Sequence, residues 1–187
     1  MFNENFHDGF KLISSVAGNF NILFITLVFV VYSIKDWKKI MLLFLAFITG
    51  DVLNILIINF IFHSYPAKFL LYTPPVVMML ASLINISQKS ESPARWQQVF
   101  RYVAIILFCF TSSQLLMKHN ITGIKNTDIG ADAALTLGFE CGRLIVALIV
   151  CIVTTLLISV FNVKHREMNL VASGAGLGMA MFLLFGG

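Results

Sequence analysis

The sequence contains few charged residues. Only 12% of its 187 residues are Asp, Glu, Lys or Arg, whereas 58% are hydrophobic, and the mean hydropathy is +0.88. A soluble domain of this length has too small a core to bury so many apolar side chains. The composition therefore excludes an ordinary soluble domain and indicates an integral membrane protein.

Histidine and cysteine are also scarce. All four His residues lie outside the long apolar runs, so a hydroxyl nucleophile inside a membrane would have no imidazole base. The three cysteines, Cys109, Cys141 and Cys151, lie within apolar runs and lack the spacing of a zinc site or a disulfide framework. We therefore expect no intramembrane serine protease, no other enzymatic activity and no cofactor.

Six long apolar runs are present. Each is close to the roughly 20 residues that a helix needs to cross a bilayer. A segment such as ILFITLVFVVYSI is apolar on every face, which is typical of a membrane-spanning helix. The runs lie near residues 17–34, 40–62, 67–87, 99–117, 133–161 and 168–186. The predicted fold is an all-α membrane protein, a bundle of six transmembrane helices that forms a single domain over residues 1–187.

Lys and Arg residues are unevenly divided between the loops that connect these runs. One side holds eight of them: Lys35, Lys38, Lys39, Lys89, Arg95, Arg101, Lys164 and Arg166. The other side holds four: Lys11, Lys68, Lys118 and Lys125. Because cytoplasmic loops carry the excess of Lys and Arg, we expect the first set in the cytoplasm and both termini outside it. The pI near 9.1 then reflects topology and does not indicate nucleic-acid binding.

Two apolar runs carry charged residues. Asp51 and Asn54 lie three residues apart in one run and share a helical face, and Glu140 and Arg143 are spaced in the same way in another. A charged side chain at the centre of a bilayer costs about 2.5–3.5 kcal/mol on insertion scales. Two acids and one Arg leave a surplus negative charge, so one carboxyl must be protonated, solvated or paired with a bound cation.

Two interpretations of this polar set remain open. It can line a path for a substrate or an ion, or it can form a buried network that only holds helices together. The candidate residues are the same in both cases: Asn21, Asp51, Asn54, Ser113, Gln114, Glu140 and Arg143.

Two other patterns concern helix geometry. Thr73-Pro74-Pro75 lies inside an apolar run, and consecutive prolines remove two amide donors, which predicts a helix break of the kind found at transporter sites. Gly174 and Gly178 have the small-xxx-small spacing that lets helices approach closely. We interpret these glycines as helix-packing residues.

The order of three motifs resembles the HupE/UreJ family of small membrane proteins, which are regarded as nickel- or cobalt-type permeases. The motifs are DGFKLISSVAGNFNILF, KDWKKIMLLFLAFITGDVLNIL and LGFECGR, and the correspondence covers most of the chain. The residues that keep the family frame are Gly9, Phe10, Ile13, Gly18, Ile22, Leu23, Phe24, Ala46, Phe47, Gly50, Leu137, Gly138, Glu140 and Gly142. The resemblance implies the family fold.

The differences from the family fall on its metal ligands. Where the resemblance places His or Asp ligands, this chain has Leu12, Phe20, Asn21, Asp51 and Ser113. Glu140 alone is retained, and Arg143 stands where the pattern has Gln. Nickel and cobalt favour imidazole nitrogen, and a guanidinium opposes a cation, so we expect no metal in the bundle. Metal candidates outside it are His7, His63 and His119.

Two functional hypotheses follow. The first is a non-catalytic subunit or scaffold of a membrane complex, in which Asp51 and Glu140 pair with Arg143. The second is a secondary permease for a small cation or protons that uses the same three residues. For both we expect the lipid bilayer and other membrane or envelope proteins as partners, no nucleic acid, and a location in the bacterial inner (cytoplasmic) membrane.

Overall fold

The computed structural model describes residues 2–13, 16–60, 67–88, 95–120 and 129–185, with side chains except at 16–19, 58–60, 67–71, 113–120, 129 and 131–132. This part of the chain is almost entirely helical, which confirms the all-α prediction. Its seven α-helices and one short 3-10 helix are α1 (Phe2–Leu12), α2 (Val16–Phe29), η1 (Ile34–Asp36), α3 (Trp37–Phe60), α4 (Ala67–Ser87), α5 (Arg95–Asn120), α6 (Ile129–Ser159) and α7 (His165–Phe185).

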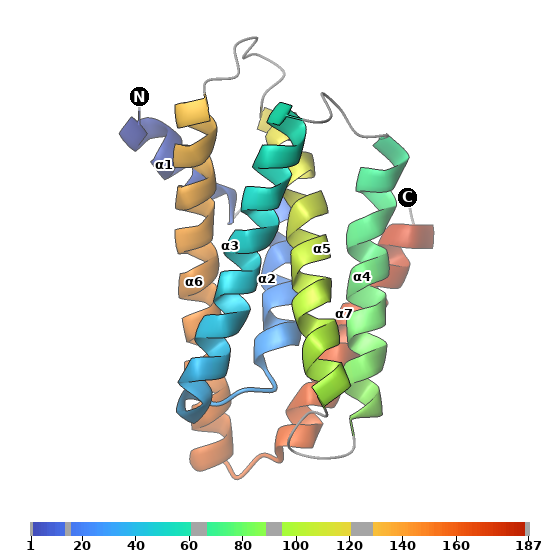
Figure 1. The fold of residues 1–187 in the computed structure, drawn as a ribbon. Helices are drawn as coiled ribbons and strands as arrows, with labels where there is room; N and C mark the ends of the chain where they lie inside the picture. Colours follow the sequence, from blue (N-terminus) through green and yellow to red (C-terminus); the bar gives the residue numbers. More distant parts are fainter. Residues whose placement is uncertain (1, 14–15, 61–66, 89–94, 121–128, 186–187) are drawn as a thin grey trace.

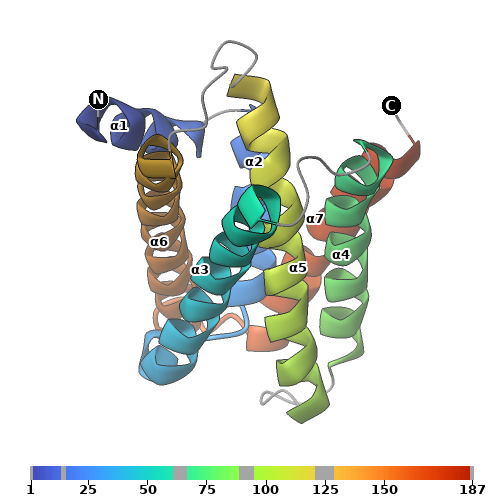
Figure 2. The ribbon, with the colours of Figure 1, turned by 45° about the horizontal axis from the view of Figure 1, so that its top comes forward.

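The six longer helices form one bundle around α2 (Figures 1 and 2). α3 packs on α5, α5 also packs on α4, and α4 packs along α7. α2 contacts α6 and α7 and reaches α4 and α5 as well. The start of α1 and the end of α7 lie toward the same end of the bundle. Because α2 is apolar on all faces, it fits this central position.

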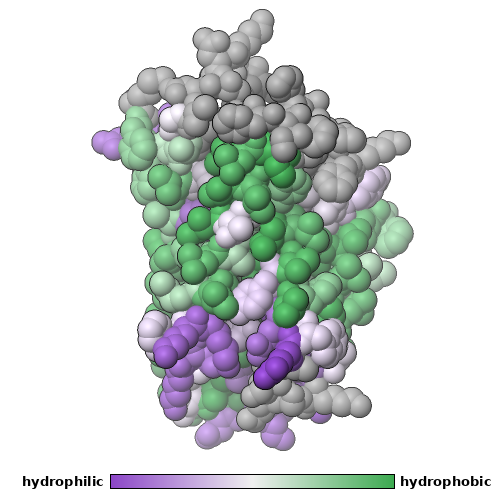
Figure 3. Space-filling view, viewed as in Figure 1, coloured by the Kyte–Doolittle hydropathy of each residue, from purple (hydrophilic) through white to green (hydrophobic). Residues whose placement is uncertain are grey.

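Three segments in the described part of the chain are long and apolar enough to cross a membrane, judged by length and composition. They are Ile34–Ile57, Ala133–Ser159 and His165–Phe185. Phe20–Phe29 and Tyr72–Ser87 are shorter apolar helices. Figure 3 shows a hydrophobic band over the middle of one face, with hydrophilic residues gathered at its lower end. The six helices α2–α7 match the six predicted runs, and a six-span topology stays a prediction.

The helix break predicted at Thr73-Pro74-Pro75 is absent. α4 runs without interruption from Ala67 to Ser87, with both prolines inside it. Pro74 and Pro75 fall in the first half of the helix and are buried. A proline costs the helix one amide donor, and that loss is tolerated where neighbouring helices enclose the freed carbonyl.

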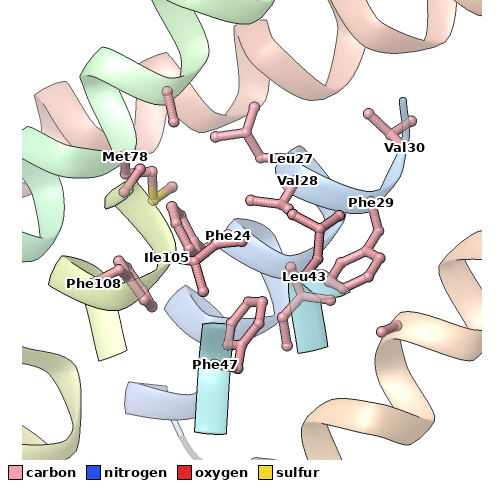
Figure 4. Packing of buried hydrophobic residues seen from close by; sticks show 14 of the residues in the cluster. Phe24, Leu27, Val28, Phe29, Val30, Leu43, Phe47, Met78, Ile105 and Phe108 are labelled. Carbon is pink, nitrogen blue, oxygen red and sulfur yellow. The ribbon is translucent and has the colours of Figure 1, made fainter. Parts of the chain in front are cut away.

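Aromatic rings from three helices form the middle of the core. Phe24 of α2 stacks on Phe108 of α5, with ring centroids 3.8 Å apart and planes 9° apart. Phe47 of α3 meets Phe24 edge-on at 6.3 Å. Figure 4 shows these rings gathered with Ile105 and Met78. Aromatic pairs of this kind add about 0.5–1.5 kcal/mol beyond their buried area, so they help to fix α3 and α5 against α2.

α1 is an additional helix ahead of the first predicted apolar run. It lies across the end of α6 (Figure 2) and touches it through two glycines. A Cβ added to Gly9 would overlap the backbone carbonyl of Leu135, and one added to Gly138 would overlap that of Phe6. The two backbones therefore meet directly, and only glycine fits at either position.

Close packing through Gly174 and Gly178 does not occur among the described residues. A Cβ on either glycine would meet nothing within 4 Å. The buried face of α7 instead contains Ala172, Gly176 and Ala180, and a Cβ on Gly176 would lie 2.7 Å from Ser82 Oγ. Both faces of this helix carry small residues at the same spacing, so the sequence pattern could not tell which one faces α4.

We predict that Gly138→Ala separates α1 from α6. The new methyl group would overlap the Phe6 carbonyl, and overpacking of this kind costs about 1–3 kcal/mol. The matched control is Gly174→Ala, which meets no atom and should leave stability unchanged or slightly higher. Thermal unfolding in detergent measures both variants. Equal midpoints would show that α1 does not depend on this contact.

Candidate functional site

The charged residues predicted from the sequence meet at one buried point of the bundle. Asp51 comes from α3, and Glu140 and Arg143 come from α6. Their exposed fractions are 1%, 6% and 1%. Because Glu140 and Arg143 are one turn apart, α6 presents both to α3 on the same face.

The Arg143 guanidinium donates hydrogen bonds to side chains of four helices. Nη1 donates to Asp51 Oδ2 at 2.7 Å and to Glu140 Oε1. Nη2 donates to Asn21 Oδ1 of α2 at 2.9 Å and, more weakly, to Ser112 Oγ of α5 at 3.4 Å. Arginine suits this position because its donors are fixed in one plane and point in several directions. One side chain therefore links α2, α3, α5 and α6.

Two aromatic rings also contact the guanidinium. Its central carbon lies 4.3 Å from the ring centroid of Phe139 and 5.5 Å from that of Phe47. A cation held near aromatic rings gains about 0.5–2 kcal/mol, and more when water is excluded. The rings thus offset part of the cost of burying Arg143.

The site is not fully satisfied in hydrogen bonding. Three buried side-chain atoms of α6 have no hydrogen-bond partner among the described residues: Glu140 Oε2, Arg143 Nε and Thr136 Oγ1. Thr136 lies one turn before Glu140 on α6. Two carboxylates facing one guanidinium also leave one net negative charge. Buried polar groups are normally paired, so these atoms are exceptions within the described part of the site.

The structure brings most of the predicted polar site residues close together. Asn21, Asp51, Glu140 and Arg143 are in direct contact, and Asn54 is buried one turn further along α3. The side chains of Ser113 and Gln114 lie outside the described part. Ser112, which was not in the predicted set, supplies the α5 contact. The polar stretch at 111–114 indicated this helix, but helix rotation decides which of its residues faces Arg143.

A second buried arginine was missed. Arg101, predicted in a cytoplasmic loop, lies within α5 and is 2% exposed. It donates to Asn85 Oδ1 at 2.8 Å, to Gln88 Oε1 at 2.6 Å and to Tyr32 Oη at 3.3 Å. No carboxylate contacts it in the described part. The end of α4, at Ser87, lies beside it, and the partial negative charge of a helix C-terminus stabilises a cation there.

Asn85 extends this second centre to two more helices. Its Nδ2 donates to the Leu27 carbonyl of α2 at 2.8 Å, and Asn169 of α7 donates to the Asn85 carbonyl at 2.9 Å. Arg101 and Asn85 therefore connect α2, α4, α5 and α7. A sequence pattern could have indicated this centre. Asn85 and Gln88 lie three residues apart at the end of one apolar run, and Arg101 lies near the start of the following run.

The predicted metal candidates do not form a described site. His7 is exposed on α1, while His63 and the side chain of His119 lie outside the described part. Among the described residues, no group of three or more His, Cys, Asp or Glu side chains is placed to hold a metal ion.

No protein-family model, curated protein or solved structure matches this chain. The resemblance to the HupE/UreJ family stays a prediction that rests on the motif residues.

We predict that Arg143→Leu strongly destabilises the fold. It leaves two buried carboxylates without a counter-charge, and breaking a buried ion pair costs about 3–5 kcal/mol. Adding Asp51→Asn and Glu140→Gln to the same chain should restore part of this loss, because the polar groups are then neutral. The matched control is Arg166→Leu, an exposed residue at the start of α7. Thermal unfolding in detergent checks all three, and an unchanged midpoint for Arg143→Leu would contradict the assigned role.

Proposed function

We propose that this chain is a HupE/UreJ-like protein of the bacterial inner membrane and acts as a non-catalytic subunit or scaffold of a membrane complex. The observation that carries the proposal is that Arg143 fills the polar centre of the bundle. Under the family resemblance, Asn21, Asp51 and Glu140 occupy ligand positions. Here all three accept hydrogen bonds from the guanidinium, which holds the helices together and opposes a metal ion.

The distribution of basic residues supports a six-span topology. The starts of α3, α5 and α7 lie at one end of the bundle (Figures 1 and 2). Exposed basic residues gather in these segments: Lys35, Lys38, Lys39, Arg95, Lys164 and Arg166. Under the positive-inside rule that end is cytoplasmic, and both chain termini are then extracytoplasmic.

The outer face of α7 has the features of a surface that packs against a helix of another membrane protein. Gly174 and Gly178 are exposed and touch no other helix of the described chain, and they lie between Val171 and Phe182, which are 74% and 66% exposed. A small-xxx-small surface flanked by large apolar side chains is the typical contact between membrane helices. This face is the proposed partner contact.

We predict that purification from the native host in mild detergent recovers stoichiometric membrane partners. Gly174→Leu should release them, because the larger side chain keeps a partner helix from approaching α7, while the thermal midpoint stays that of the wild type. The matched control is Val153→Leu, a change on the exposed face of α6. A monodisperse wild-type chain without partners would contradict the subunit proposal.

A permease for a small cation or protons is the second candidate, and the surplus carboxylate favours it. Asp51 and Glu140 face a single guanidinium, and intramembrane acids with a spare charge mark ion paths in other membrane proteins. In liposomes, this function predicts cation or proton flux that Asp51→Asn or Glu140→Gln stops while the thermal midpoint persists. Absence of flux for protons and for every cation tested would eliminate it.

A further inference from the structure

The first helix, α1, has one apolar side and one polar side. Phenylalanines recur every four residues, so Phe2, Phe6 and Phe10 follow one side of the helix together with Gly9. The other side is polar, and all of its residues are exposed: Asn3, Glu4, His7, Asp8 and Lys11. A helix with two such distinct sides suits a boundary between an apolar phase and water.

Packing against α6 covers only part of the apolar side. Gly9 is buried against the backbone of Leu135, and Phe6 is half-buried. Phe2 and Phe10, in contrast, have exposed fractions of 57% and 36%. The Phe2 ring stacks on that of Phe6, with centroids 6.5 Å apart, so the apolar side is continuous from the covered part to the exposed part. The described chain therefore leaves much of this phenylalanine stripe uncovered.

The contact with α6 fixes how far α1 lies from the start of the apolar run. The backbones meet at Leu135 and Gly138, which lie three and six residues beyond Asp132, the last charged residue before the run. At a rise of about 1.5 Å per residue, α1 crosses α6 about 4.5–9 Å inside that point. An amphipathic helix at a bilayer surface buries its apolar face by about 5–10 Å. The depth of α1 thus matches that of an interfacial helix.

The orientation and the charge of α1 identify the kind of surface. α1 lies across the end of α6 and not along it (Figure 2), which is the direction of a bilayer surface when α6 crosses the bilayer. Its polar side carries two acids and one Lys, so it has no excess of positive charge to attract anionic headgroups. Burial of the aromatic rings, and not charge, is then the attractive force.

We propose that α1 is an interfacial helix whose stripe of Phe2, Phe6 and Phe10 inserts among zwitterionic phospholipids, between the headgroups and the upper acyl chains. This goes beyond the subunit or permease function and rests on the proposed position of the bundle in a membrane. Under the proposed topology, these lipids belong to the extracytoplasmic leaflet. The insertion holds the nearby end of α6 at a fixed depth.

Depth-dependent fluorescence quenching of the full chain in phosphatidylcholine vesicles tests this proposal. In a background of Trp37→Phe and Trp96→Phe, both at exposed positions, Phe10→Trp places one indole on the stripe. Lipids brominated near the headgroup end of the acyl chain should quench it roughly twofold more than lipids brominated at the chain end. The matched control is Asp8→Trp, about 200° away around the helix. Its indole should be quenched by acrylamide in water and hardly by either lipid.

Two outcomes separate this proposal from the membrane location itself. In the wild type, quenching of Trp37 and Trp96 by the same lipids reports whether the bundle lies in the bilayer, and α1 does not affect it. If they are quenched and the Phe10→Trp indole is not, α1 is not interfacial although the membrane location holds. If neither is quenched, both ideas fail. Phe2→Trp, also at an exposed ring, replaces Phe10→Trp if the latter does not fold.

The remaining outcomes assign the stripe to something else and also overturn the proposal. Quenching that appears only after anionic phosphatidylglycerol is added would attribute the attachment to headgroup charge. Equal lipid quenching of Phe10→Trp and Asp8→Trp would show that α1 does not insert by one side. A Phe10→Trp indole that acrylamide reaches in vesicles of the lone chain, but not in native membranes, would assign the stripe to a partner protein.

Discussion

The bundle depends on one buried guanidinium. Arg143 is 1% exposed and accounts for hydrogen bonds to three other helices. A charge at this depth is stable only with its partners, and each partner is buried only because the charge satisfies it. The interaction is therefore mutual: removing any member leaves a polar atom that no water reaches. This constraint sets which faces of α2, α3 and α6 are directed toward the guanidinium.

A second buried arginine, Arg101, also links several helices by hydrogen bonds, but its partners are neutral side chains. Arg101 and Asn85 connect α2, α4, α5 and α7, whereas Arg143 connects α2, α3, α5 and α6. α2 and α5 belong to both centres, so the two networks together include every long helix. The aromatic stack of Phe24 on Phe108 joins the same two helices. Apolar side chains can slide against each other, whereas a guanidinium that is hydrogen-bonded to several helices holds its partners in one geometry and so helps to fix the register of the bundle.

Glycine decides how closely the backbones approach. At Gly9 and Gly138 the chains of α1 and α6 touch directly, and at Gly50 a Cβ would lie 2.7 Å from that of Cys109. Gly9, Gly50 and Gly138 are among the residues that carry the resemblance to the HupE/UreJ family, and at each of them an added Cβ would overlap a neighbouring helix. Gly174 and Gly178 have no such reason within the described chain, which is why their outward face is the one proposed for a partner.

The sequence by itself determined the helices and the charge imbalance. Apolar runs predict helices whatever surrounds them, and the pairing of Glu140 with Arg143 follows from helical spacing. Tertiary structure decided the rest. In the folded bundle Ser112 contacts the Arg143 guanidinium, and Arg101, which was predicted in a loop, lies buried within α5. α4 is continuous through Pro74 and Pro75. Gly176 is the glycine of α7 that faces the bundle. These outcomes depend on helix rotation and on which helices are neighbours, and neither is encoded in the local hydrophobic pattern of a helix that is apolar on every face.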